Sequence, residues 1–199
     1  MRRKIVSATP KALEKSGLPC MSCTRWEGLP ESMDPGRSRA AKTKHLRRIV
    51  KEWGECGKIV YVEGKALAYA QYAPPEYWPG ARASSPNPIS DDAVYLTCLC
   101  VLPYARGKGL GRVLLQSIEA SLVKRRIKAI ETLAVRNNEH PPGPIEFYLQ
   151  NGFYIAKEDP RYPLLRLELK ALVGWQINIQ FALDGLKIPA GRRASAPVV

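Results

Sequence analysis

The chain has 199 residues, 45% of them apolar and 25% charged, which is enough for one globular domain with a substantial core. No apolar run approaches the roughly 20 residues of a membrane-spanning helix, and the N-terminus lacks the apolar stretch of a signal peptide. Lys and Arg number 31 against 18 Asp and Glu, a formal charge of +13. Such an excess attracts polyanions without choosing among nucleic acid, anionic membranes, acidic protein surfaces and the phosphates of a small molecule. We therefore expect a cytoplasmic protein with an anionic ligand or partner and no membrane contact.

Five cysteines without a secretory signal favour reduced thiols over a disulfide framework. Cys20 and Cys23 have a spacing typical of zinc or redox sites, but no second pair of this kind follows. If residues 20–26 form a strand, these two thiols point to opposite faces and do not share a metal. Cys98 and Cys100 share one face of a predicted strand and are interpreted as core. No metal site is expected.

The first half of the chain predicts a helix and a hairpin. Residues 1–19 form an N-terminal segment with two weak elements, and residues 30–36 form a loop. A helix is expected over 38–53, followed by a β-hairpin with strands 58–62 and 65–72. Seven basic residues fall in and just before this helix: Arg37, Arg39, Lys42, Lys44, Arg47, Arg48 and Lys51. They fit a polyanion-binding surface and equally an ordinary solvated helix face.

Residues 73–90 are rich in proline and carry two aromatic residues, Tyr77 and Trp78, that look exposed. The segment is too long for an ordinary hairpin connection. It is either a lid or ordered arm over a binding site, or a passive connection.

The most informative stretch joins a strand, a glycine-rich loop and a helix. Residues 94–101 are apolar on both faces, and apolar residues from Leu110 onward recur at helical spacing until about Arg125. Between them, Arg106-Gly107-Lys108-Gly109-Leu110-Gly111 brings glycines and free N–H groups to a helix N-terminus, which favours an anion such as a phosphate. A dinucleotide fingerprint needs a further glycine where Leu114 stands, and a P-loop needs Ser or Thr where Gly109 stands.

The second half predicts a strand, a short helix, a strand pair and a tail. These elements are a strand over 127–135, a helix over 144–150 ended by Asn151-Gly152, and strands over 153–158 and 164–170. The tail 171–186 fits both a helical stripe and strand alternation, and we favour the helix. Residues 191–199 are expected to be disordered.

Two motifs resemble those of the GNAT superfamily of acyl-CoA-dependent N-acyltransferases. The first is Arg106-x-x-Gly109-x-Gly111, and the second is Tyr148-Leu149-Gln150-Asn151-Gly152-Phe153. The resemblance covers about residues 58–170. It implies an α/β (α+β) fold with a single GNAT-like domain, in which helices flank a central mixed, mostly antiparallel sheet. That domain spans residues 20–170, with a proline-rich loop insertion and a C-terminal extension over 171–199.

The resemblance further implies an N-acetyltransferase that uses acetyl-CoA as co-substrate and an amine acceptor of unknown identity. Pantetheine amides would bond the backbone of the central strand, and the pyrophosphate would rest on the glycine loop. The implied donor-site residues are Leu99, Val101, Arg106, Gly107, Lys108, Gly109, Leu110, Gly111, Arg112 and Asn138.

Tyr148 matches the superfamily's tyrosine that donates a proton to the coenzyme A thiolate, and a phenol of pKa about 10 suits that role. The base is harder to assign, because Tyr95 stands where many members carry glutamate. Asp92 and Glu131 are the candidate bases, and each also fits a surface carboxylate.

Two alternatives remain beside the acetyltransferase. One is a non-catalytic acyl-CoA-binding module that keeps the loop and lacks the base. The other is a nucleic-acid-associated protein that acts through its basic helix, although nucleic acid is an unlikely partner because no RNA-stacking motif is present. The C-terminal extension packs either on the domain or on a second copy, so a homodimer is also an expectation.

Overall fold

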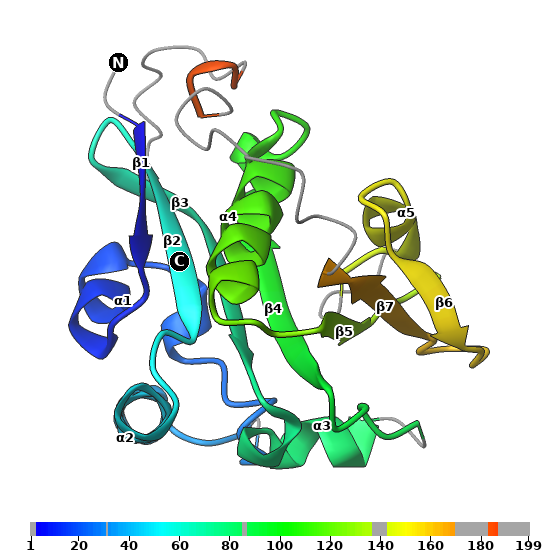
Figure 1. Ribbon diagram of the computed structural model, residues 1–199. Helices are drawn as coiled ribbons and strands as arrows, with labels where there is room; N and C mark the ends of the chain where they lie inside the picture. Colours follow the sequence, from blue (N-terminus) through cyan, green and yellow to red (C-terminus); the bar gives the residue numbers. More distant parts are fainter. Residues whose placement is uncertain (1–2, 31, 85–86, 137–142, 170–182, 187–199) are drawn as a thin grey trace.

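The computed structural model describes residues 3–30, 32–84, 87–136, 143–169 and 183–186 and forms one open sheet of seven strands with helices on both faces (Figure 1). The order is β1-β2-β3-β4-β5-β7-β6, and every neighbouring pair is antiparallel except the parallel pair β4 and β5. This confirms the predicted mixed, mostly antiparallel sheet. The strands are β1 (Arg3–Ser7), β2 (Gly57–Val62), β3 (Lys65–Ala73), β4 (Ala93–Val101), β5 (Ala129–Leu133), β6 (Tyr154–Lys157) and β7 (Leu164–Glu168).

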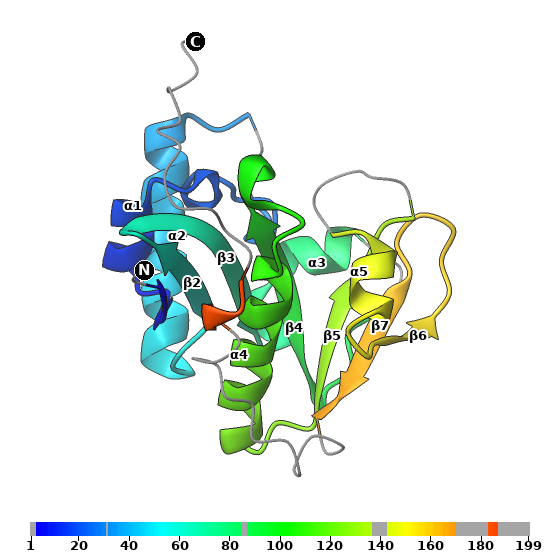
Figure 2. The same cartoon turned by 90° about the horizontal axis from the view of Figure 1, so that it is seen from above.

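The helices form two layers, one on each face of the sheet. The α-helices are α1 (Pro10–Ser16), α2 (Pro35–Glu52), α3 (Pro79–Ser84), α4 (Leu110–Lys124) and α5 (Ile145–Leu149), and the 3₁₀ turns are η1 (Pro19–Met21), η2 (Pro75–Tyr77) and η3 (Pro103–Ala105). Helices α4 and α5 cover one face, and α1 and α2 cover the other (Figure 2). Two apolar clusters fill the space between sheet and helices, one on each side.

Strand β4 is central because both of its faces are covered. Val94 and Leu96 belong to the core beneath α4, whereas Tyr95 belongs to the core on the α2 side. A strand buried on both faces has no polar alternation, which explains its apolar run.

Strands β4 and β5 pair only at their beginnings. The parallel register runs from Ala93 opposite Ala129 to Tyr95 opposite Glu131. At the next position, the Thr132 hydroxyl donates to the Leu96 carbonyl at 2.8 Å, and no further ladder pair joins the two strands. The ladder with β5 therefore ends at Tyr95, and beyond it β4 pairs with β3 alone.

Helix α2 begins three residues earlier than predicted. The Asp34 side chain accepts hydrogen bonds from the N–H groups of Gly36 at 2.9 Å and Arg37 at 3.1 Å, and Pro35 occupies the first helical position. An Asp cap followed by proline is a strong start signal. The predicted hairpin is confirmed as β2 and β3.

The predicted strand over 20–26 is wrong. The N–H groups of Met21 and Ser22 bond the carbonyls of Leu18 and Pro19, three residues back, which makes the 3₁₀ turn η1, and turns follow. Proline at the first position favours such a turn, because it fixes the helical φ angle. The segment therefore packs on the sheet instead of joining it.

Residues 73–90 contain η2 and α3, and their aromatic residues are not exposed as the sequence suggested. Trp78 is fully buried, its indole N–H donates to the Ala73 carbonyl at 3.2 Å, and its ring lies 5.2 Å from that of His45. Tyr77 is buried as well. These contacts anchor the segment around Trp78 on α2 and on the loop before it, and its place over a binding site stays a prediction.

Gly80 makes the closest backbone contact of this arm. Its N–H donates to the Trp26 carbonyl at 3.0 Å, and a Cβ atom at Gly80 would lie 2.0 Å from the carbonyl oxygen of Arg25. We expect Gly80→Ala to lower the free energy of unfolding by about 3 kcal/mol or more, because backbone on both sides must shift. Urea denaturation measures this loss. Gly36→Ala, which meets only the Asp34 side chain, is the control and should change stability by less than about 1 kcal/mol.

The two ends of the described chain meet at the edge of the sheet. Residues 3–7, predicted as part of a separate N-terminal segment, form edge strand β1 beside β2. The Arg3 guanidinium donates to the carbonyls of Leu183 at 2.6 Å and Asp184 at 2.7 Å, and Leu183 and Leu186 are buried in the α4-side core. Most of the predicted helix over 171–186 lies outside the described residues. Within the described ranges, no helix has the length and apolar character needed to cross a bilayer.

Candidate active site

The glycine loop places an uncapped helix N-terminus beside β4. Gly107 and Gly109 have φ angles of +69° and +82°, in the left-handed region that glycine adopts without strain. Gly109 is the N-cap of α4, no side chain caps the helix, and its first turn holds no acidic residue. The first N–H groups of a helix have no acceptor within it, and they carry its positive dipole end. This end of α4 is therefore suited to an anion.

A cavity of about 470 Å³ opens between this loop, the end of β4 and helix α5. Eight of the predicted donor-site residues line it: Leu99, Val101, Arg106, Gly107, Gly109, Leu110, Gly111 and Arg112. The other lining residues are Ala105, Gly143, Pro144, Phe147, Tyr148, Gln150 and Asn151. The cavity adjoins the second half of β4, beyond its last ladder pair with β5.

Two predicted donor-site residues are placed differently. Lys108 is not among the lining residues, and its ammonium donates to the Tyr104 carbonyl at 3.0 Å. Asn138 lies outside the described residues. Arg106 lines the cavity while its Nε donates to the Val101 carbonyl at 3.1 Å, so its charge stays at the rim.

Gln150 and Asn151 line the cavity, and sequence reasoning missed both. The Asn151 amide donates to the Phe147 carbonyl at 2.7 Å, which leaves the side-chain carbonyl as an acceptor. The sequence assigned Asn151 only to the end of the short helix. Its place directly before the Gly-Phe of the second motif was the available signal.

Tyr148 is buried in the wall of the cavity, 2% exposed, between the rings of Phe147 and Phe153 at centroid distances of 5.2 and 5.3 Å. Burial raises the pKa of its phenol above the ordinary value of 10, with the Thr132 hydroxyl acting in the opposite direction. The raised pKa keeps the phenol protonated at neutral pH, so Tyr148 can serve as a proton donor.

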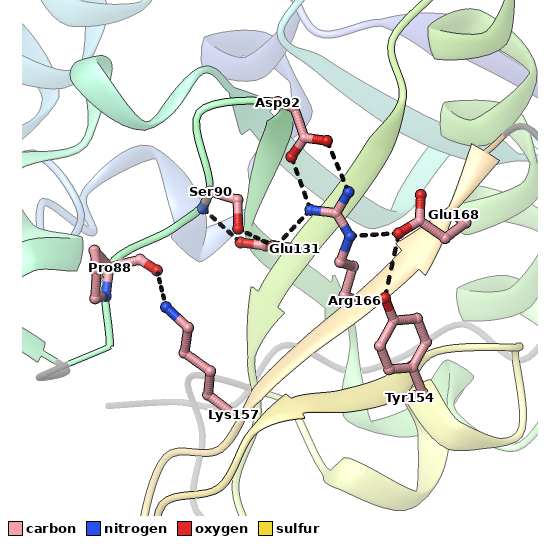
Figure 3. Close-up of polar contacts among 8 residues, drawn as sticks. All are labelled: Pro88, Ser90, Asp92, Glu131, Tyr154, Lys157, Arg166 and Glu168. Atoms are coloured by element: carbon pink, nitrogen blue, oxygen red, sulfur yellow. Dashed lines mark hydrogen bonds and ion pairs between the residues drawn. The ribbon is translucent and has the colours of Figure 1, made fainter.

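Asp92 and Glu131 are brought together, but away from the cavity (Figure 3). The Arg166 guanidinium donates to both oxygens of Asp92 at 2.9 and 3.0 Å, to Glu131 at 2.8 Å and to Glu168 at 2.6 Å. Glu131 also accepts from the N–H and hydroxyl of Ser90, each at 2.8 Å. We call Asp92, Glu131, Arg166 and Glu168 the Arg166 cluster.

The Arg166 cluster limits these carboxylates as bases. The hydrogen bond from Arg166 lowers the pKa of Asp92 below its ordinary value, which favours the carboxylate form and weakens it as a proton acceptor. Glu131 is 1% exposed and already holds three hydrogen bonds. The geometry favours a structural role for both, and a role as base stays a prediction.

The opposite face of the sheet carries a buried polar cluster that sequence reasoning also missed. The Lys42 ammonium donates to Glu27 at 2.6 Å, with both side chains 2% exposed. The Gln71 amide donates to the same Glu27 oxygen at 3.3 Å, and the Tyr69 hydroxyl donates to Gln71 at 2.7 Å. Nothing in the local sequence distinguishes Lys42 from the other cations of its helix.

The thiols are grouped by the fold and not by their spacing. Cys20 belongs to the same apolar cluster as Cys98 and Cys100 on β4. All three pack in the core on the α2 side, and Cys23 is not in that cluster. Across the described ranges, no group of three or more His, Cys, Asp or Glu side chains has an arrangement that could hold a metal ion.

The fold matches solved N-acetyltransferases at low sequence identity. The PaiA N-acetyltransferase from Thermoplasma acidophilum, solved with coenzyme A, superposes with a TM-score of 0.57 at 15% identity over 84% of this chain and 99% of its own. An N-acetyltransferase from Staphylococcus aureus Mu50 superposes with a TM-score of 0.57 at 16% identity, over 85% of this chain and 99% of its own. The ribosomal-protein-S18-alanine N-acetyltransferase from Escherichia coli superposes with a TM-score of 0.50 at 18% identity, over 84% of this chain and 94% of its own. Curated protein sequences gave no match.

These likenesses define the class of fold, which is that of the N-acetyltransferases. The model of the acetyltransferase (GNAT) family matches residues 23–153, well over half of the chain. The chain belongs to the GNAT family of acetyltransferases.

Proposed function

We propose that the protein transfers an acetyl group from acetyl-CoA to a primary amine, by direct attack of the amine on the thioester in a ternary complex. The observation that carries this proposal is the cavity itself, which joins an uncapped helix N-terminus at one end to a buried tyrosine in its wall. Few other chemistries need an anion site and a protonated phenol in one cavity.

The lining residues suit coenzyme A. The N–H groups at the start of α4, with Arg106 and Arg112 at the rim, would hold the pyrophosphate. Apolar Leu99 and Val101 lie beyond the last ladder pair of β4 with β5, so the backbone groups they present on that side could bond pantetheine amides, except the Val101 carbonyl that accepts from Arg106. The structure of the Thermoplasma acidophilum enzyme in complex with coenzyme A supports coenzyme A as the ligand.

Tyr148 would donate its phenolic proton to the departing thiolate. Negative charge develops on the sulfur as the thiolate departs, and such a charge is costly in a buried site. A positioned proton donor neutralises it and so lowers the barrier to acyl transfer. The acceptor amine must lose a proton before it attacks, and the base for this step is not assigned.

An acyl-CoA-binding module without catalysis is the second candidate. It is favoured by the Arg166 cluster, which holds both predicted bases outside the cavity. Turnover with a panel of amines separates the two candidates, since the module would bind acetyl-CoA and release no free coenzyme A.

Tyr148→Phe tests the assigned role. We expect kcat to fall by about 100-fold, the lower end of the range for a positioned proton donor, while the affinity for acetyl-CoA stays within about threefold. Because burial raises the pKa of Tyr148, wild-type kcat should show no loss from its ionisation up to about pH 10. The release of free thiol over pH 6–10 measures both effects.

Tyr154→Phe is the matched control, since Tyr154 is 47% exposed and lies outside the cavity. It should keep kcat within about twofold. A Tyr148→Phe enzyme that retained wild-type kcat across this pH range would refute the proton-donor role.

A further inference from the structure

Helix α2 carries an exposed basic surface that the acetyltransferase site does not use. Of its seven basic residues, only Lys42 is buried, in the ion pair with Glu27. Glu52 is the only acidic residue of the helix. The other six cations are exposed: Arg37, Arg39, Lys44, Arg47, Arg48 and Lys51.

Four of these cations form one stripe, which we call the α2 stripe: Arg37, Lys44, Arg48 and Lys51. At 100° per residue they fall within an arc of about 60°, and they extend over about 21 Å of the helix axis. The buried residues of α2, among them Leu46 and Ile49, lie on the opposite side of the helix. The stripe therefore points directly to solvent.

The stability of the helix does not explain this arrangement. Apart from the Asp34 cap before it, the first turn holds no acidic residue, yet it holds Arg37, a cation that the positive dipole end disfavours. Lys44 and Arg48 repel each other at a spacing of four residues. Only Arg48 has a helical counter-charge, in an ion pair with Glu52 at 3.3 Å between half-exposed side chains. A solvated face that served the helix alone would mix both signs.

The chemistry of the stripe selects among anionic partners. A membrane-surface helix needs a free apolar face, but that of α2 is buried in the core. A protein interface needs apolar or aromatic anchors, and the exposed face of α2 offers only Val50, which is 37% exposed. Contacts to a phosphate backbone need neither, and guanidinium groups bind phosphate with two hydrogen bonds.

We propose that the α2 stripe binds nucleic acid through its phosphate backbone. From the sequence alone, nucleic acid is an unlikely partner, because the seven basic residues also fit an ordinary solvated helix face and no RNA-stacking motif is present. The uniform sign, the cations at the N-terminus and the lack of apolar anchors now favour it. No residue of α2 lines the cavity, so this binding is separable from acyl transfer and does not rest on the proposed function.

The test compares two triple variants of equal net charge. Arg37→Gln/Lys44→Gln/Lys51→Gln removes three cations of the stripe. Lys65→Gln/Lys124→Gln/Lys128→Gln removes three exposed cations elsewhere. Glutamine is a good helix former, so both proteins should fold, and unchanged thermal midpoints and acetyl-CoA affinity check this.

The measurement is fluorescence anisotropy of a labelled RNA hairpin and a labelled DNA duplex at 50 to 200 mM KCl. We expect wild-type affinity to fall steeply with salt, and the stripe variant to bind at least tenfold more weakly at 50 mM. Its slope of log affinity against log salt should be smaller by about 2 to 3, since about 0.7 to 0.9 counterions are released per phosphate contact. The control variant should stay within about twofold of wild type.

Three results would overturn the proposal. The first is no binding of either nucleic acid by the wild type at 50 mM KCl. The second is an equal loss in both variants, which would assign the effect to net charge alone. The third is competition by polyglutamate as strong as by unlabelled nucleic acid of equal charge, which would point to an acidic polypeptide.

Discussion

Gly109→Glu is expected to weaken the binding of acetyl-CoA by about 100-fold or more. Gly109 is the N-cap of α4 and lines the cavity, so the new carboxylate would stand beside the pyrophosphate site. Like charges brought together in a partly closed site cost several kcal/mol, and 100-fold corresponds to about 2.7 kcal/mol. A Cβ atom there would also lie 3.0 Å from Leu186, so the side chain has little room to turn away. Isothermal titration calorimetry measures the affinity.

Gly64→Glu separates this effect from backbone strain and added charge. Gly64 lies in the β2–β3 turn with φ +77°, close to the +82° of Gly109, and a Cβ atom there would meet no atom within 4 Å. Both variants therefore carry a left-handed glutamate and one extra negative charge. The Gly64 variant should keep wild-type affinity within about twofold.

Either of two results would contradict the placement of the donor. A wild-type protein that binds no acetyl-CoA below about 1 mM would remove the proposed function itself. Equal binding by wild type and Gly109→Glu would show that the pyrophosphate lies elsewhere, while leaving an acyl-CoA site in place.

Arg166→Met is expected to lower the free energy of unfolding by about 3 kcal/mol at pH 7. The Arg166 side chain is 13% exposed and the Glu131 side chain 1%, so the variant leaves Glu131 buried without its counter-charge. Removing one partner of a buried ion pair costs about 3 to 5 kcal/mol. Because the two hydrogen bonds from Ser90 to Glu131 remain, we expect a loss of stability near the lower end of this range. Chemical denaturation at fixed pH measures it.

The loss should depend on pH. Hydrogen bonds from Arg166 lower the pKa values of Asp92 and Glu168 below the ordinary 3.8 and 4.5. A lowered folded-state pKa contributes stability above the ordinary pKa, and that contribution disappears as the pH falls through the folded-state pKa. The difference between wild type and Arg166→Met should therefore be largest near neutral pH and shrink below about pH 4.

Two comparisons isolate the buried pair. Arg136→Met breaks an ion pair with Glu158 whose side chains are 43% and 69% exposed, and it should cost less than about 1 kcal/mol. Glu131→Gln placed in the Arg166→Met protein should recover about half of the lost stability, because it removes the stranded charge. Equal, small losses from both arginine variants would show that the Arg166 cluster does not stabilise the fold.

Glu131→Gln in the wild type also tests the predicted base. A structural role predicts a loss of stability with kcat kept within a few fold at a temperature where the protein is folded. A catalytic role predicts a loss of kcat in the folded protein, greatest at low pH, where the amine needs the base most.

Local signals in the sequence determined the wall of the cavity that the glycine loop and the end of β4 form. The apolar run of β4, the glycines at 107, 109 and 111, and the helical stripe of α4 each act over a few residues. They fix a strand, a loop and a helix N-terminus in direct succession, which is enough to build one wall of the cavity. The hairpin and the final strand pair follow from alternation and turn residues in the same way.

Contacts between distant segments were decided only by the tertiary structure. Arg166 meets Glu131, 35 residues away, because the two stand opposite each other in the register of β5 and β7. Cys20 shares an apolar cluster with Cys98 and Cys100 and not with Cys23, because the packing of η1 buries Cys20 in the core on the α2 side of the sheet. Sheet register and the choice of face depend on how whole elements pack, and a shift of one residue would send each side chain to the other face. Periodicity within one segment carries no information about that choice, so the role of each carboxylate and thiol had to await the fold.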